Sequence, residues 1–171
     1  MEIVNIKIKN FSDCILGVKL YDNENLLITA LNPVDYVLDG IRFINLKKIE
    51  NITDESDSFK NKVMKLKFQR YLDSLNLSMF KNFEIKNFQN LFTIIKQEDL
   101  LCEFSFNKED VVYIGNIIYV YENSIDVNFY DDECQLDESD NIDFENITSI
   151  TLFSDYLNSL SEFMKNNLLF V

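Results

Sequence analysis

Short runs of alternating apolar and polar residues dominate this chain, and they predict β-strands. The first run, IVNIKIK at residues 3–9, alternates with a period of two, which places one side of a strand in a core. Turn residues such as DNEN at 22–25 separate it from the runs that follow. The other predicted strands are 14–21, 26–31, 36–38 and 41–46 and, later in the chain, 101–106, 112–121, 125–130 and 141–144.

Three segments carry apolar residues at helical spacing instead, at 56–75, 87–97 and 154–164. Asp57 or Ser58 is the expected cap of the first helix, and Ser154 is the expected cap of the third. The first helix is also basic, and we expect it to lie against the acidic part of the same chain. Its basic residues are Lys60, Lys62, Lys65, Lys67 and Arg70.

The chain repeats part of its own pattern at an offset of 98 residues. LDGIRFINLKKIENI at 38–52 returns as LDESDNIDFENITSI at 136–150, and the same offset carries Gly17 onto Gly115. Glycine inside a strand usually marks a bulge or a bend. Several short strands in about 50 residues favour a small closed barrel, because closure removes exposed strand edges.

These patterns together predict an α+β fold that is mainly β. We expect two tandem SH3-like or Sm-like small β-barrels, related by the internal repeat and each followed by a helix. Since a domain of about 50 residues is only marginally stable alone, the helices should pack across both barrels and form one cooperative body. The predicted boundaries are a first barrel at 1–55, a helical connector at 56–98, a second barrel at 99–153, and a C-terminal helix and tail at 154–171.

Two long segments resemble a family of uncharacterised bacterial proteins with two modules. YIGNIIYVYENSIDVNFYDDECQLDESDNIDFENITSITLFSDYLNSL, residues 113–160, resembles their C-terminal module, and residues 17–52 resemble their N-terminal module. GVKLYDNEN and DGIRFI also resemble Sm-like ring proteins, with a shorter Gly-to-Asn spacing than that family has. The resemblance implies tandem small barrels, and it brings no activity, cofactor or functional residue with it.

Composition places the chain among globular proteins. It has 171 residues, of which 47% are hydrophobic, with only three glycines and one proline. The N-terminus lacks a signal-peptide pattern, and no apolar run reaches the roughly 18–20 residues that span a bilayer. We therefore expect a cytoplasmic protein with no membrane partner. The three cysteines, Cys14, Cys102 and Cys134, form no C-x-x-C pair and are expected to be reduced, structural thiols.

Charge is distributed unevenly along the chain. Residues 1–55 carry a net charge of −3, residues 56–96 carry +5, and residues 97–171 carry −15, which gives −13 in total. The acidic part should repel phosphate backbones, so nucleic acid is not an expected partner.

The sequence lacks the groups that common catalytic sites require. It has no histidine, no Walker A motif and no G-x-G-x-x-G motif, so we predict no catalytic, cofactor-binding or metal-binding residues. An EF-hand starting at Asp137 fails, because Ile142 and Thr148 occupy its glycine and glutamate positions, and a less regular cation site stays open. Asp39 and Asp137, related by the offset, are expected to fix turns through their own backbone.

The leading prediction is a non-enzymatic, cytosolic protein-interaction module that binds a basic protein through an acidic surface. An immunity-type inhibitor of a basic toxin, a metal-dependent enzyme that uses carboxylates, an Sm-like RNA binder and a homodimer stay open as alternatives. The predicted partner-binding residues are Asp126, Asp131, Asp132, Glu133, Asp137, Glu138, Asp140, Asp143 and Glu145.

Overall fold

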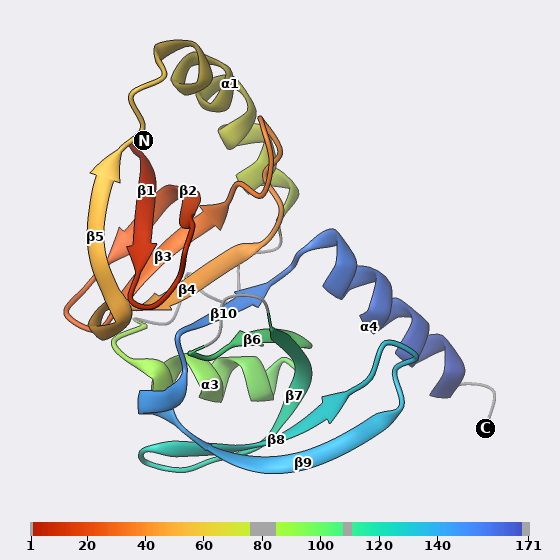
Figure 1. The fold of residues 1–171 in the computed structure, drawn as a ribbon. Helices are drawn as coiled ribbons and strands as arrows, with labels where there is room; N and C mark the ends of the chain where they lie inside the picture. The colour runs from red at the N-terminus through yellow and green to blue at the C-terminus, as the bar shows by residue number, and fades with distance from the viewer. Residues whose placement is uncertain (1, 76–84, 108–110, 169–171) are drawn as a thin grey trace.

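The strands of this protein join into one continuous antiparallel sheet (Figure 1). The computed structural model describes residues 2–75, 85–107 and 111–168. Within these residues the strands lie in the order β5-β1-β2-β3-β4-β10-β6-β7-β8-β9, so β5 and β9 are the two edges. The strands are β1 (Glu2–Ile8), β2 (Cys14–Asp22), β3 (Leu26–Leu31), β4 (Ile41–Asn45), β5 (Ile49–Asp54), β6 (Cys102–Ser105), β7 (Val112–Val120), β8 (Ser124–Tyr130), β9 (Leu136–Asp143) and β10 (Ser149–Leu152).

The described helices are α1 (Ser58–Ser74), α3 (Phe88–Gln97) and α4 (Asp155–Leu168), with short 3-10 turns η1 (Leu46–Lys48) and η2 (Phe144–Asn146). The three predicted helices are confirmed, and so are two of their caps. The Asp57 carboxylate accepts the backbone N–H groups of Phe59 and Lys60 at 2.8 and 3.1 Å, and the Ser154 hydroxyl accepts that of Leu157 at 3.2 Å. Residues 76–84 of the predicted connector and 169–171 of the predicted tail lie outside the described residues.

The predicted pair of tandem small barrels, each followed by a helix, is wrong, because the sheet is open and runs through both halves of the chain. We call β1–β5 the first half and β6–β10 the second half. A closed first barrel would need its own strand beyond β4. That position is taken by β10, which pairs Ser149 with Ile44 and Leu152 with Ile41 and pairs on its other side with β6. Each half therefore covers one strand edge of the other, at β4 and β10, while β5 and β9 remain as edges.

All but one of the predicted strands are present in whole or in part, and two observed strands were not predicted. Residues 36–38 lie in the loop before β4 and form no strand. The edge strand β5 and the central strand β10 were not predicted. Both halves have the same strand order, since the fifth strand of each pairs with the first. The register also shifts between Lys19 and Tyr21 in β2 and between Ile117 and Tyr119 in β7.

The largest cluster of buried apolar side chains runs through both halves of the sheet. It includes Phe43 on β4, Phe104 on β6 and Phe92 on α3, all of them fully buried. A second cluster of buried apolar side chains lies in the first half and includes residues of β1, β3 and β4. A third cluster includes Leu157 of α4. β3 is buried along almost its whole length, as expected for a strand covered on both faces. The shared cluster ties the two halves into one packed body.

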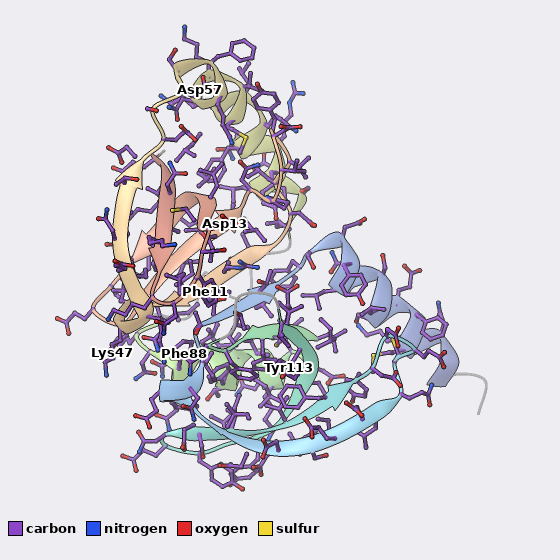
Figure 2. All side chains as sticks on the ribbon, in the orientation of Figure 1. Phe11, Asp13, Lys47, Asp57, Phe88 and Tyr113 are labelled. Atoms are coloured by element: carbon purple, nitrogen blue, oxygen red, sulfur yellow. The ribbon has the colours of Figure 1, made fainter. Side chains whose placement is uncertain are left out.

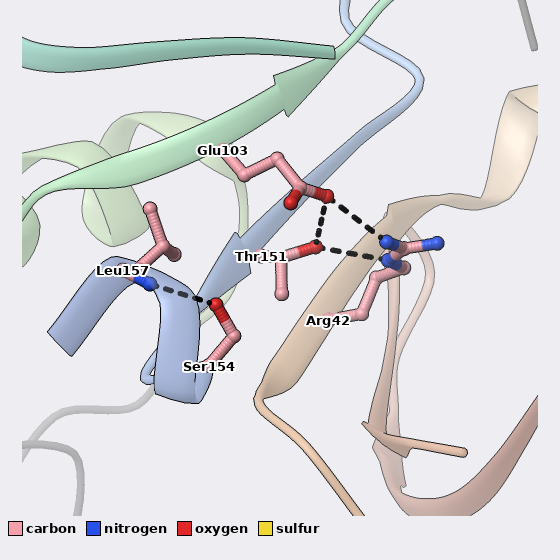
Figure 3. Close-up of polar contacts among 5 residues, drawn as sticks. All are labelled: Arg42, Glu103, Thr151, Ser154 and Leu157. Atoms are coloured by element: carbon pink, nitrogen blue, oxygen red, sulfur yellow. Dashed lines mark hydrogen bonds and ion pairs between the residues drawn. The ribbon is translucent and has the colours of Figure 1, made fainter. Parts of the chain in front are cut away.

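A ladder of polar side chains crosses the junction between the halves (Figure 3). Arg42 on β4, Thr151 on β10 and Glu103 on β6 are direct neighbours in the strand register. The Arg42 guanidinium donates to the Thr151 hydroxyl at 3.0 Å and to the Glu103 carboxylate at 3.1 Å. The two charged side chains are only 15% and 17% exposed. Burial lowers the pKa of the Arg42 guanidinium, and the adjacent Glu103 carboxylate opposes that shift.

Two further polar contacts hold the halves together. The buried Asn45 donates its backbone N–H to the Thr148 carbonyl at 2.9 Å and its side-chain amide to the Ile147 carbonyl at 3.1 Å. The Asp39 carboxylate accepts the backbone N–H of Asp155 at 2.7 Å, at the start of α4. Asp39 thus stabilises a helix of the other half, whereas the sequence predicted that it would bond its own turn.

Gly115 is required where β7 lies close to β8. A Cβ atom at this position would lie 2.7 Å from the Asn128 carbonyl oxygen and 2.7 Å from a methyl carbon of Val127, whereas at Gly17 the nearest atom, the Thr29 Cβ, is 3.0 Å away. We expect Gly115→Ala to lower the free energy of unfolding by about 1–3 kcal/mol, because it overpacks a rigid backbone contact. Urea titration should show a smaller loss for Gly17→Ala, and equal losses would contradict the close approach to β8.

Candidate functional site

The nine predicted acidic residues lie along and around the edge strand β9. β9 pairs with β8 on one side and has no described neighbour on the other, and all but one of its residues are exposed. We call β9 and the preceding turn 131–135 the acidic edge. Asp137, Glu138, Asp140 and Asp143 lie on β9, Asp131, Asp132 and Glu133 lie in the turn, Asp126 lies on β8, and Glu145 lies in η2.

The acidic side chains project from both faces of this edge. Glu138 and Asp140 pair with Phe129 and Val127, whose side chains are buried, so these two carboxylates lie on the core-facing side. Asp143 lies on the opposite face, since successive side chains of a strand alternate. The structure therefore brings seven of the nine predicted residues to one strand edge, from which carboxylates extend in two directions, and places Asp126 and Glu145 beside it.

Two of the predicted residues have clear roles in the local structure. One carboxylate oxygen of Asp131 accepts two backbone N–H groups of the turn, at 3.0 and 2.8 Å. Asp126 accepts the Tyr121 hydroxyl and the Asn141 amide, both at 2.8 Å. The hydrogen bond to Asp126 raises the pKa of the Tyr121 hydroxyl. Asp131 shapes the turn and Asp126 ties β9 to β8, so the carboxylates on β9 itself are the better candidates for binding a partner.

A polar cleft of about 860 Å³ opens between the two halves, and no feature of the sequence predicted it. Lys47 and Lys48 line it from the first half, and Asp143 and Glu145 line it from the second. Lys47 and Phe88, both labelled in Figure 2, line the same cleft, and Phe88 lies at the start of α3. Six asparagines add amide groups that donate and accept hydrogen bonds. Its described lining contains no serine, cysteine or threonine, and its lysine, carboxylate and amide groups equip the cleft for binding polar groups.

The sequence predicted that the basic helix α1 lies against the acidic part of the chain, and this prediction is wrong. Figure 1 shows α1 and β9 at opposite ends of the molecule. Met64 of α1 is buried in the main core, and the Lys67 ammonium donates to the Tyr36 carbonyl of the first half. Within the described residues no basic side chain of α1 forms an ion pair. The molecule is thus polarised, with a basic end and an acidic end.

Neither a cluster of metal ligands nor a disulfide is found among the described residues. No group of three or more aspartate, glutamate or cysteine side chains is placed there to hold a metal ion. The three cysteines are free thiols: Cys14 is exposed, Cys134 is half-buried and Cys102 is buried. Burial raises the pKa of the Cys102 thiol far above its ordinary value, which keeps this group protonated and unreactive.

No family model, curated protein or solved structure matches this chain. A function must therefore be argued from the residues and surfaces of this molecule alone.

Proposed function

We propose that this chain is a non-enzymatic, cytosolic protein-interaction protein that binds an extended basic segment of a partner along the acidic edge. The observation that carries the proposal is that β9, an exposed strand of eight residues, has one side unpaired among the described residues. Such an edge offers a row of backbone donors and acceptors to which a further strand can add.

The charges of β9 favour one kind of strand. The strand carries four carboxylates and no basic residue. Two copies of β9 paired with each other would place like charges side by side, which is destabilising. A partner strand with lysine or arginine at every second position would instead place its ammonium or guanidinium groups beside Glu138 and Asp140, which share one face.

A labelled eight-residue peptide of alternating lysine and threonine should bind the full chain, with a dissociation constant measured by fluorescence anisotropy. We expect the variant Glu138→Lys/Asp140→Lys to weaken binding by about tenfold, since two attractive cross-strand pairs become repulsive. The matched control Asp132→Lys/Glu133→Lys changes the net charge equally but lies in the turn, so its effect should be less than about threefold.

The same peptide should slow hydrogen exchange at β9 amides, because strand addition pairs them. If the wild type does not bind, or if both variants weaken binding equally, the acidic edge is not a site of strand addition. A peptide of alternating glutamate and threonine should not bind under the same conditions.

A further inference from the structure

The outward face of α1 carries apolar side chains that the fold leaves uncovered. Phe59 is 63% exposed and Leu66 is 76% exposed. They are seven residues apart, two turns of helix, and so lie on the same side of α1. Met64, the one buried residue of α1, projects about 140° away from Phe59 at 100° per residue. The helix therefore has apolar residues on two sides, and only one of these packs on the sheet.

The loop before β4 extends this apolar surface. The ring of Tyr36 contacts that of Phe59 edge-to-face, with centroids 6.2 Å apart. Val34 and Val37 on either side of Tyr36 are exposed as well. Exposed apolar side chains gathered on one side of a molecule mark an interaction site more often than singly scattered ones do. We call Val34, Val37, Phe59 and Leu66 the α1 patch.

Basic side chains outnumber acidic ones on the helix that carries Phe59 and Leu66. α1 contains four lysines and one arginine against a single acidic residue, Asp73. Lys62, Lys65 and Arg70 are exposed, and the described residues contain no ion pair to any of them. The exposed Phe and Leu side chains can enter the acyl boundary of a bilayer while the flanking bases meet anionic headgroups.

We propose that α1 and the adjoining loop bind the surface of an anionic lipid bilayer. No described helix is long and apolar enough to cross a membrane, and the mode inferred here is interfacial. The acidic edge lies at the far end of the molecule and would point away from the headgroups (Figure 1). A second copy fits less well, because its acidic edge offers mainly carboxylates and amides, which would not cover four apolar side chains. This inference does not depend on the proposed function of the acidic edge.

Co-sedimentation of the full chain with vesicles tests the proposal. We expect the wild type to bind vesicles of 30% phosphatidylglycerol in phosphatidylcholine at least tenfold more tightly than vesicles of phosphatidylcholine alone. Phe59→Ser/Leu66→Ser should weaken binding to the anionic vesicles at least tenfold, whereas Leu136→Ser, an exposed leucine on β9, should not. Lys62→Glu/Lys65→Glu should weaken binding by more than Lys9→Glu/Lys47→Glu, which changes the net charge equally away from α1.

Circular dichroism melts should show that the Phe59 and Leu66 variant stays folded, because both side chains are largely exposed. Size-exclusion chromatography of the same proteins reports on self-association. The proposal is overturned if the wild type does not bind anionic vesicles, or if the control variants weaken binding as much as the variants of α1. It is also overturned if Phe59→Ser/Leu66→Ser dissociates an oligomer without changing vesicle binding.

Discussion

Glu103→Leu is expected to lower the free energy of unfolding by about 3 kcal/mol, because it leaves the charge of Arg42 without its counter-ion at the junction of the two halves. The guanidinium would keep its hydrogen bond to Thr151 but would lose its only described carboxylate partner. A mostly buried charge without its counter-ion is among the costlier defects that a single substitution creates. Urea unfolding followed by circular dichroism measures the loss.

The double variant Arg42→Met/Glu103→Leu is the control for that experiment. It removes both charges and replaces them with apolar side chains of similar length, so its stability should lie within about 1 kcal/mol of the wild type. A double variant as unstable as the Glu103 single variant would show that strand packing at the junction, and not the unpaired charge, accounts for the loss.

Phe104→Ala is expected to lower the free energy of unfolding by about 3–5 kcal/mol, the cost of a large cavity in a tightly packed core. Phe104 is fully buried in the cluster that both halves share, and its ring meets that of Phe129 edge-to-face with centroids 5.8 Å apart. Because β6 pairs with β10, and β10 pairs with β4, the loss should appear in the unfolding of the whole sheet.

Two probes distinguish whole-sheet unfolding from loss of the second half alone. Within each protein, the tyrosine signals of the two halves, or hydrogen exchange at β3 and β8 amides, should report one shared transition. The midpoint of that transition should be lower in Phe104→Ala than in the wild type. If β3 amides remain protected while β8 amides exchange, the two halves unfold independently, and the shared cluster contributes less than its burial implies.

Local sequence patterns were sufficient to predict the described helices and most of the strands. α1 and α4 follow residues whose side chains satisfy the first backbone N–H groups, and those capping residues are visible in sequence. The strands that alternate cleanly, such as β8, have one buried and one exposed face, which produces the period of two.

The strands that were missed lack that alternation for physical reasons. β10 lies between two strands at the centre of the sheet and is buried at every position, so its four residues show no period. β5 is an edge strand with five of its six residues exposed, so it has few apolar positions to detect. Missing β10 also hid the junction, because that strand is the one that joins the halves.

The sequence by itself determined the three described helices, the caps of α1 and α4, most strands, and the division of charge into a basic middle and an acidic C-terminal part. These features depend on neighbouring residues, which the sequence states directly. The tertiary structure alone decided that β10 pairs with β4, that the carboxylates gather on an open strand edge, and that the basic helix faces away from them with Phe59 and Leu66 uncovered. Each of these outcomes depends on which distant strands share hydrogen bonds, and the residues of one strand do not specify its partner when several strands have similar apolar faces.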